Sequence, residues 1–351
     1  MKYADLFSGI GGFRNAADHI SQDTDVKFKC VGFSEIDQYA LTTYGSNYNI
    51  NGETRMHDIT EFTEDERQLK QLKKVDLLLG GFPCQSFSLL GKKLGLEDER
   101  GKILFSIDKL LQAKKPKFIV LENVRNIIKH DKGNTLEKII TFFKEHKYRY
   151  TNYVILDSQN FGLPQKRARI FFVCSKKQLN IELTEQAVID NFRNINNHSL
   201  PIYNNVLDVL DKKVDSKYYL SEKIKHTILD GGSKNFWSKS QIDLDIARTL
   251  TATMVKMHRA CQDNYYSDDF IRKGISHKDT PKEILFTKPV RRLTPKEALL
   301  LQGFNQQFYH NAINAGVSEH QLYKQAGNAL SVNTGYALLH YLFVNQRIQD
   351  S

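Results

Sequence analysis

Residues 5–13 read DLFSGIGGF and continue an apolar run that begins at Lys2. This stretch predicts a strand over Lys2–Phe7, then a glycine-rich turn and a helix, because glycine lets the backbone turn tightly and approach a ligand closely. The amino end of such a helix favours a negatively charged group. The dinucleotide fingerprint GxGxxG is incomplete, since Arg14 stands where its third glycine would be. Taken alone, the stretch also fits an ordinary strand–helix turn.

The same alternation of apolar runs and helix-like segments continues to about residue 180. Continuous apolar runs between helices are typical of a parallel sheet that is buried on both faces. The further strand candidates are Phe28–Phe33, Val75–Leu79, Phe118–Leu121, Val154–Leu156 and Arg169–Val173, and the helix-like segments include Tyr39–Tyr44 and Ile103–Ala113. We therefore predict an α/β fold with a doubly wound, Rossmann-like, mostly parallel sheet.

The second half of the chain has a different pattern. From about residue 185 to 290 it is polar and shows no strand–helix alternation, which predicts a smaller domain with long loops. Helical patterning returns at Thr294–Gln302, where Thr294 can cap a helix that starts with Pro295. We expect one last amphipathic helix over Asn328–Asn345.

Composition restricts the kind of protein. The 351 residues suffice for about two domains, and 50 Lys and Arg against 40 Asp and Glu give a net charge of +10. This surplus suits a polyanionic partner such as nucleic acid, or equally a solvated basic surface. We expect no membrane span and no secretory signal. The cysteines Cys30, Cys84, Cys174 and Cys261 form no CxxC pair; we expect no disulfide, no metal site and a reducing cytoplasm.

Two acidic residues follow expected strands after the glycine turn. Glu35 comes 26 residues after Gly9, at the end of the second strand, where it could bind ribose hydroxyls. Asp58, followed by Ile59, is a second candidate of this kind. With the incomplete glycine fingerprint, this pattern fits an adenosine-containing ligand without a pyrophosphate, such as S-adenosylmethionine.

Candidates for chemistry follow three other strands. Cys84 comes just after the VDLLL strand in GGFPCQSFS, where an exposed thiol could act as a nucleophile, although a lone cysteine is more often a buried apolar residue. Glu122 closes the FIVL strand, and a carboxyl group there could donate a proton near neutral pH or simply begin a helix. Arg167 and Arg169 alternate along an expected strand, so they could form one anion clamp or a salt-bridge pair.

Eight motifs in this order make the chain resemble the DNA (cytosine-5)-methyltransferases of bacterial restriction–modification systems: FSGIGGF, SEID, HDI, GGFPCQSFS, ENV, QKRAR, RRLTPKEALLLQGF and QAGNALSV. The resemblance implies an enzyme that flips a cytosine out of duplex DNA, attacks its C6 and transfers a methyl group from S-adenosylmethionine to C5. It further implies a monomer, and a cognate restriction endonuclease that cuts the same site.

The resemblance also implies a division of the chain and roles for its residues. The catalytic domain would be 1–188, completed by 320–351, with a target-recognition domain at 189–290 and a connecting hinge at 291–319. The cofactor residues would be Phe7, Gly9, Gly11, Gly12, Glu35, Ile36, Asp58, Ile59, Pro83 and Asn328. Ile36 stands where relatives often carry Trp, which implies a weaker contact with adenine.

Cys84 would be the nucleophile and Glu122 would contact N3 and the amino edge of cytosine. Arg167 would contact the base, supported by Gln165 and Arg169. The DNA-binding residues would be Gln85, Ser88 and Lys92 in the loop after Cys84, and Arg248, Thr249, Leu250, Lys256 and Arg259 in the recognition domain. Arg248, Lys256 and Arg259 could equally be solvated surface residues without a DNA contact.

Three alternatives come from other functional classes. A tRNA cytosine-5 methyltransferase would share the fold, but the recognition region of about 100 residues favours duplex DNA. A catalytically inactive DNA-binding homologue is disfavoured by the presence of Cys84, Glu122 and Arg167. A nucleotide-dependent oxidoreductase is disfavoured by the incomplete GxGxxG pattern.

Overall fold

The computed structural model describes residues 1–82, 99–229, 232–233, 236–237, 241–256, 259 and 261–349. The chain divides into two compact units: unit 1 is Met1–Asp157, Ala168–Ser199 and Thr334–Ser351, and unit 2 is Ser158–Arg167 and Leu200–Asn333. Unit 2 is therefore larger than the recognition domain expected at 189–290. In the parts of the chain described here, no helix has the length and apolar character to cross a membrane.

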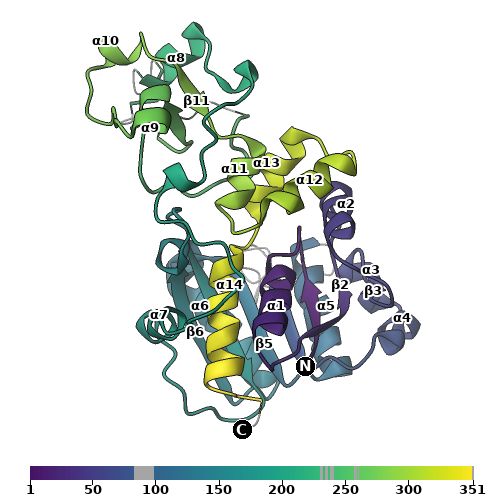
Figure 1. The fold of residues 1–351 in the computed structure, drawn as a ribbon. Coiled ribbons are helices and arrows are strands. Elements are labelled where there is room, and N and C mark those ends of the chain that lie inside the picture. The colour runs from purple at the N-terminus through teal and green to yellow at the C-terminus, as the bar shows by residue number, and fades with distance from the viewer. Residues whose placement is uncertain are drawn as a thin grey trace. The chain divides into compact units, whose positions relative to one another are not determined.

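Unit 1 is built on a seven-stranded sheet with the strand order β3-β2-β1-β4-β5-β7-β6 (Figure 1). The strands are β1 (Lys2–Leu6), β2 (Lys29–Phe33), β3 (Thr54–Arg55), β4 (Leu77–Gly81), β5 (Phe118–Val124), β6 (Tyr150–Asp157) and β7 (Ala168–Ser175). The pairs from β3 to β5 are parallel, whereas β7 is antiparallel to both β5 and β6. The predicted mostly parallel sheet is confirmed.

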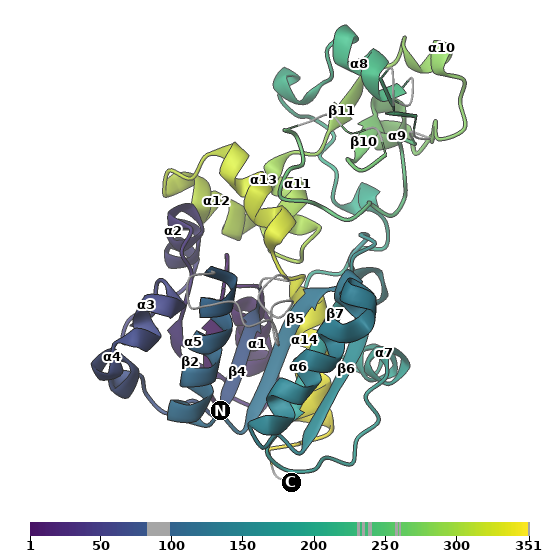
Figure 2. The same ribbon diagram turned by 180° about the vertical axis from the view of Figure 1, so that it is seen from behind.

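Helices cover both faces of this sheet, so most side chains of its central strands are buried. The helices of unit 1 are α1 (Gly12–Asp23), α2 (Gln38–Asn47), α3 (Ile59–Glu64), α4 (Glu66–Gln71), α5 (Glu99–Lys114), α6 (Asn134–Glu145), α7 (Glu185–Arg193) and α14 (Val332–His340), with short turns η1 (Arg125–Ile128), η2 (His130–Gly133) and η6 (Tyr341–Asn345). Figures 1 and 2 show α1 and α14 over one face and α5 and α6 over the other. Leu77, Leu78 and Leu79 of β4 are fully buried between them.

Unit 2 has short elements joined by long loops, as the polar middle of the sequence predicted. Its helices are η3 (Ser158–Phe161), η4 (Val206–Asp208), η5 (Ser216–Tyr218), α8 (Glu222–Leu229), α9 (Asp268–Lys273), α10 (Lys282–Leu285), α11 (Pro295–Leu300), α12 (Gln306–Asn314) and α13 (Glu319–Asn328). Its strands form two antiparallel pairs, β8 (Gly232–Ser233) with β9 (Phe236–Trp237) and β10 (Tyr265–Ser267) with β11 (Val290–Arg292).

The predicted cap of α11 is confirmed. Thr294 Oγ1 accepts a hydrogen bond from Glu297 N at 3.2 Å, and Glu297 Oε2 accepts one from Thr294 N at 2.7 Å. Glu297 also forms a buried ion pair with Arg291, with 2.8 Å between Oε1 and Nη2. These contacts join β11 to α11 and stabilise the second half of unit 2.

The predicted helix over Asn328–Asn345 was wrong at its start. Asn328 ends α13, Ala329 is extended with φ −63° and ψ 145°, and α14 begins only at Val332. The break has a physical cause, because Arg167 Nη2 donates to the carbonyls of Gly327 and Ala329 at 3.0 and 2.7 Å. These bonds hold the chain out of helical geometry.

Candidate active site

The glycine turn after β1 has the backbone that the sequence predicted. Gly9 and Gly11 have φ angles of 54° and 86°, a left-handed region that glycine adopts without strain. A β-carbon on Gly11 would lie 2.5 Å from Cε2 of Tyr48, so a side chain is also excluded by space. Gly11 caps α1, and the helix begins at Gly12. The turn therefore brings the amino end of α1 to the carboxyl edge of the sheet.

Glu35 lies just beyond β2, and three backbone N–H groups fix its carboxylate. Oε2 accepts from Gly9 N at 2.8 Å, while Oε1 accepts from Ile36 N at 2.9 Å and Asp37 N at 2.8 Å. Since a carboxylate offers about four acceptor sites, these bonds leave it able to accept from a ligand hydroxyl. Glu35 thus holds the glycine turn and remains suited to bind a ribose.

A pocket of about 580 Å³ opens beside Glu35. Its lining residues are Phe7, Ser34, Glu35, Ile36, His57, Asp58, Ile59, Thr60, Glu61, Glu64, Lys102 and Ile103. Ile36 is 75% exposed, which offers an apolar surface to a flat ring. Asp58 caps α3, and its Oδ1 accepts from the backbone N and the Oγ1 of Thr60, both at 2.7 Å. The volume suits a small ligand, and the acidic wall suits one that carries hydroxyl and amino donors.

Asp5 in β1 is a buried acid that the sequence did not single out. It is 1% exposed, and its Oδ2 has no hydrogen-bond partner among the described atoms. Burial raises the pKa of Asp5 from 3.8 to about 7, and the nearby positive charge of Arg14 opposes the rise only in part. A neutral Asp5 is therefore favoured over much of the acidic range.

We expect the Asp5→Asn variant to gain stability relative to the wild type as the pH rises from about 4 to 7. Because its pKa is raised on folding, Asp5 retains in the folded state a proton that the unfolded state loses. The wild type therefore loses stability across this window, by up to about 4 kcal/mol at about 1.36 kcal/mol per unit, whereas Asn cannot ionise. Urea unfolding at a series of pH values measures the difference, and parallel stability curves would contradict it.

Glu122 and Arg169 meet at the carboxyl edge of the sheet. The strand register pairs Gly81 with Glu122 across β4 and β5, and Val124 with Arg169 across β5 and β7. Arg169 Nε lies 3.0 Å from Glu122 Oε1, and each side chain is 15% exposed. A β-carbon on Gly81 would lie 3.2 Å from Glu122 Oε2, so glycine leaves room for the carboxylate. This edge offers both an acceptor and a planar donor to a ligand.

Asn123 is a positioning residue that sequence reasoning missed. It is 2% exposed, and its Nδ2 donates to the carbonyl of Phe82 at 2.9 Å. The predicted nucleophile Cys84 comes two residues after Phe82 in the sequence. Cys84 lies outside the described residues, and so do Pro83, Gln85, Ser88 and Lys92. The sequence did carry a signal for Asn123. Side chains alternate along a strand, so the residue next to Glu122 must point to the opposite face of the sheet.

Gln165 and Arg167 bind backbone groups within unit 2. Gln165 is fully buried; its Nε2 donates to Leu301 O at 2.9 Å, and its Oε1 accepts from Leu250 N at 3.0 Å. Arg167 is 3% exposed, and its Nη1 donates to Leu250 O at 2.9 Å, besides the two Nη2 bonds to carbonyls at the end of α13 and just after it. Both side chains therefore stabilise the fold of unit 2.

The sequence left an anion clamp and a salt-bridge pair open for Arg167 and Arg169, and in the structure the two arginines have different partners. The two lie in different units, because β7 begins at Ala168 and Arg167 precedes it. Arg169 is the arginine beside Glu122, whereas the Nη atoms of Arg167 serve backbone carbonyls. Arg169, and not Arg167, therefore lies beside Glu122, the residue that was expected to contact the cytosine.

The expected recognition residues differ in their surroundings. Arg248 Nη1 donates to the carbonyls of Gln241 and Asp263, and burial lowers the pKa of its guanidinium. Leu250 is 2% exposed, so it lies in the interior rather than on a reading surface. Lys256 is exposed, which leaves it available to a phosphate.

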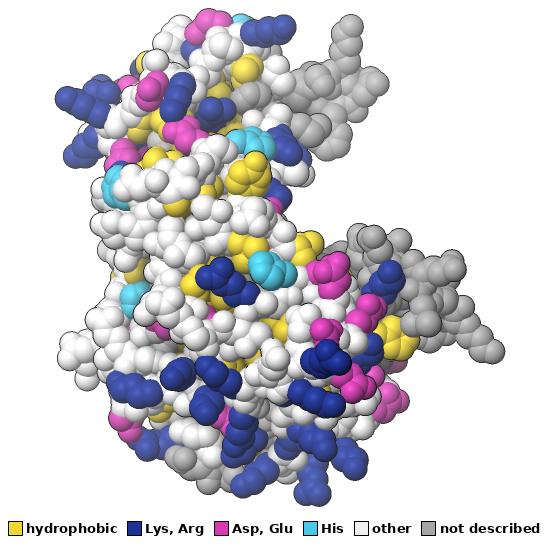
Figure 3. Space-filling view, turned by 90° about the vertical axis from the view of Figure 1, so that its right-hand side faces the viewer, with side chains coloured by type: hydrophobic (Ala, Val, Ile, Leu, Met, Phe, Trp, Pro, Cys, Tyr) yellow, Lys and Arg dark blue, Asp and Glu magenta, His cyan; other side chains and the backbone are white. Residues whose placement is uncertain are grey.

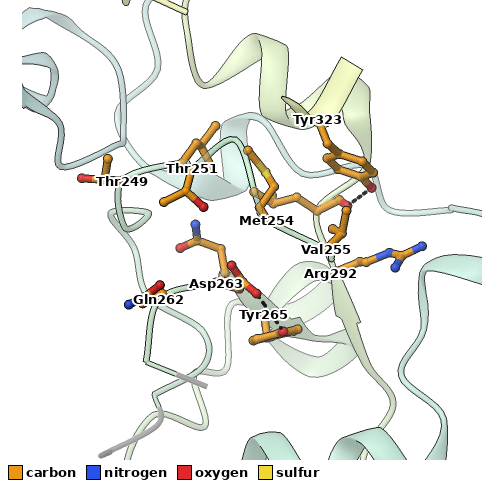
Figure 4. A pocket seen from close by; sticks show the side chains of 12 residues that line it. Thr249, Thr251, Met254, Val255, Gln262, Asp263, Tyr265, Arg292 and Tyr323 are labelled. Atoms are coloured by element: carbon orange, nitrogen blue, oxygen red, sulfur yellow. Dashed lines mark hydrogen bonds between the residues drawn. The ribbon is translucent and has the colours of Figure 1, made fainter. Parts of the chain in front are cut away.

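A small pocket adjoins this recognition segment (Figure 4). Its walls include Thr249, Asp263, Tyr265 and Arg292, but its volume is only about 20 Å³, enough for about one water molecule. Thr249 Oγ1 itself donates to Lys166 O at 2.5 Å. The pocket is therefore too small to accept a base.

Two further predicted residues lie in unit 2. Arg259 is partly exposed; its Nη1 donates to Gln262 Oε1 and its Nη2 to Thr253 Oγ1, both at 2.6 Å. Asn328 is the exposed last residue of α13. Within the described ranges, no group of three or more His, Cys, Asp or Glu side chains is arranged to hold a metal ion.

A doubly wound sheet with an acidic pocket and a carboxylate–guanidinium pair at its carboxyl edge is typical of α/β enzymes that bind a nucleotide-like cofactor. The family model for C-5 cytosine-specific DNA methylases matches residues 1–343, and the chain belongs to this family. It is a DNA (cytosine-5)-methyltransferase, so the oxidoreductase alternative was wrong.

Curated relatives extend over almost the whole chain. The Type II methyltransferase M1.ScrFI of Lactococcus lactis subsp. cremoris is 33% identical over 96% of this chain and 76% of the relative. M.NlaX of Neisseria lactamica is 34% identical over 95% of this chain and 93% of the relative. Among solved structures, the methyltransferase EhMeth of Entamoeba histolytica matches with a TM-score of 0.73 over 98% of both chains at 21% identity, which concerns the fold alone.

Proposed function

We propose that this methyltransferase binds S-adenosylmethionine beside Glu35 and methylates a cytosine that has left the DNA helix at a specific sequence. The observation that carries the proposal is the pair of Glu122 and Arg169, 3.0 Å apart at the end of β5. Gly81, opposite Glu122 in the register, precedes Cys84 by only three residues. The carboxyl group of Glu122, for the cytosine ring, and the thiol of Cys84, for its C6, thus come from the ends of neighbouring strands β5 and β4.

The residues of the pocket fit the cofactor. Glu35 would accept from the ribose hydroxyls, Asp58 from the adenine amino group, and Ile36 would pack on the adenine ring. The glycine turn would allow the close approach of the methionine part, because Gly9 carries no side chain. S-adenosylmethionine supplies the methyl group that the reaction transfers.

The residues of the chain prepare the cytosine for this transfer. Cytosine C5 is a poor nucleophile, so Cys84 first adds to C6 as a thiolate. Glu122 protonates or hydrogen-bonds N3, which lets the ring accept the electron pair. Arg169 orients that carboxylate and can donate to the base. After C5 has gained its methyl group, water removes the C5 proton and the bond between Cys84 and C6 breaks.

The substrate is duplex DNA in this proposal, and the target base must leave the stack at a cost of a few kcal/mol. Lys256 and Arg259 contact phosphates, and the loops of unit 2 read bases. We further propose that the enzyme acts as a monomer in the cytoplasm. It protects host DNA from a cognate endonuclease, which the Type II names of M1.ScrFI and M.NlaX support.

Methylation of plasmid DNA followed by bisulfite sequencing tests this function. We expect protected cytosines at one short recurring sequence, and none without S-adenosylmethionine. An equal amount of a tRNA transcript serves as the competing substrate. Methylation of the tRNA alone, or of cytosines without a common sequence, would contradict the proposal.

We expect Glu35→Ala to weaken S-adenosylmethionine binding by about 1.5–3 kcal/mol, because it removes a charge-assisted hydrogen bond. It also releases Gly9 N from its acceptor, so the glycine turn loses a support. Titration calorimetry measures the affinity. Glu61→Ala, which removes an exposed acid from the same pocket wall, is the matched control and should have a much smaller effect. Equal losses in both variants would argue against a specific role of Glu35.

We expect exchange of residues 212–289 for the corresponding segment of M.NlaX to change the DNA sequence that is methylated. These bounds keep the ion pair of Arg291 and Glu297 and its bond to the carbonyl of Asp211 intact. The bonds that Gln165 and Arg167 make inside the segment go to backbone atoms of Leu250, so a donor of similar backbone can form them. Bisulfite sequencing reads the outcome, and a folded chimera that keeps the original target would refute base reading by this segment.

A further inference from the structure

Unit 1 carries a dense group of exposed cations at the amino ends of its parallel strands. Figure 3 shows Lys and Arg side chains gathered at the lower end of the view, the end where Figure 1 marks the N-terminus. We call this group the basic end; its exposed members are Lys2, Lys27, Lys29, Lys73, Lys74, Lys115, Lys117, Lys147, Arg149 and Lys177. The candidate active site lies at the opposite, carboxyl edge of the same sheet and uses none of them.

Backbone hydrogen bonds bring these sequence-distant residues together. Lys117 N donates to Asp76 O at 2.8 Å, Asp76 N to Lys2 O at 2.8 Å, and Lys176 N to Lys117 O at 3.0 Å. Neighbouring strands in a sheet lie only about 4.8 Å apart. The cations of the basic end therefore form one surface rather than scattered charges.

Asp76 lies among these cations, but its carboxylate is already engaged, because it accepts from Lys2 N at 3.1 Å and lies 3.4 Å from Lys74 Nζ. The pKa of Lys176 is lowered, first by burial and then by the positive charges of Lys147 and Lys115. The cations thus act on one another, and an anionic partner would relieve this repulsion.

The position of the basic end excludes the substrate duplex as its partner. Lys117 directly precedes β5, and Glu122 lies near the carboxyl end of that strand. Five residues of strand, or about 17 Å, therefore separate the two. Duplex DNA has a persistence length of about 50 nm, so a duplex engaged at the carboxyl edge cannot fold back to reach the basic end. A second segment of DNA can reach it without bending.

We propose that the basic end is a second DNA-binding surface, which holds another duplex segment by its phosphates without reading sequence. Exposed lysines suit this role, because phosphate contacts supply the affinity of non-specific binding. An enzyme that holds two segments can pass from one to the other without entering free solution. The surface thereby serves the search for target sites and takes no part in the chemistry.

A bridging assay with the full chain tests this. One duplex with the methylated sequence is immobilised, the enzyme is added, and capture of a labelled second duplex without that sequence is measured over a range of salt concentrations. We expect capture by the wild type. The Lys115→Gln/Lys117→Gln/Lys147→Gln variant should capture about tenfold less or worse, and its salt slope should fall by about 2–3.

The matched control is Lys109→Gln/Lys138→Gln/Arg193→Gln, which removes the same charge from helices of unit 1 outside the basic end. It should keep capture within about twofold of the wild type. Both variants should methylate a short duplex with one site at the wild-type rate, which also confirms that they fold. Equal capture by the two variants, bridging by a dimer that survives the loss of Lys115, Lys117 and Lys147, or capture of RNA but not DNA would each overturn the proposal.

Discussion

Replacing Cys84 with Ala is expected to abolish methyl transfer while DNA binding is retained. The thiolate is the group that activates the ring, and without its addition C5 cannot attack the methyl donor. Cys84→Ser should be almost as inactive, because a hydroxyl is far less ionised than a thiol near neutral pH. Transfer of labelled methyl groups to plasmid DNA and a gel-shift assay measure the two properties. A Cys84→Ala variant with near-normal turnover would overturn the mechanism.

A duplex with 5-fluorocytosine at the target provides the direct test of the adduct. Fluorine cannot leave C5 as a proton does, so the wild-type enzyme should stay attached during denaturing electrophoresis when S-adenosylmethionine is present. Cys30→Ser, Cys174→Ser and Cys261→Ser are the matched controls and should still form the adduct. Burial raises the pKa of both the Cys30 and the Cys174 thiol, which keeps them protonated and poor nucleophiles. Attachment that depends on one of these three would contradict the role of Cys84.

The central sheet could be predicted because its strands are buried on both faces. Strand β5 was expected at Phe118–Leu121 and lies at Phe118–Val124, since a continuous apolar run leaves little choice of structure. The edge strands gave weaker signals. Strand β3 has only the two polar residues Thr54 and Arg55. Strand β6 is longer than the expected Val154–Leu156, because buried and partly exposed residues alternate along it and form no continuous apolar run. Hydrophobic runs therefore located the middle of the sheet better than its edges.

The candidate site could be predicted where a residue lies close to the carboxyl end of a strand. Glu35 lies two residues beyond β2 and Glu122 near the end of β5, as their sequence context indicated. The sequence could not show which arginine lies beside Glu122. Alternation places Arg167 and Arg169 on one face only if both lie in the same strand. The chain instead passes from unit 2 to unit 1 between Arg167 and Ala168. That boundary depends on long-range contacts with Leu250 and Ala329, which no local pattern reveals.

Replacing Glu122 with Gln is expected to lower turnover by a factor of about 10²–10⁴, the usual contribution of a positioned proton donor. The amide keeps the shape of the side chain but cannot protonate N3, and its pairing with Arg169 loses one charge. Binding of S-adenosylmethionine should remain within a fewfold of the wild type, because Glu35 and the pocket wall are unchanged. Single-turnover methylation and calorimetry measure these two quantities separately.

The two arginines supply the controls that assign the base contact. Arg169→Lys keeps the positive charge near Glu122 but removes the planar donor, so it should lower the rate of adduct formation on 5-fluorocytosine DNA while the unfolding midpoint changes little. Arg167→Lys should instead lower the unfolding midpoint, because it takes hydrogen bonds from buried carbonyls of unit 2. If Arg167→Lys stayed fully stable and lost adduct formation while Arg169→Lys did not, Arg167 would be the residue that contacts the base. Wild-type turnover by Glu122→Gln would remove the carboxylate from the mechanism altogether.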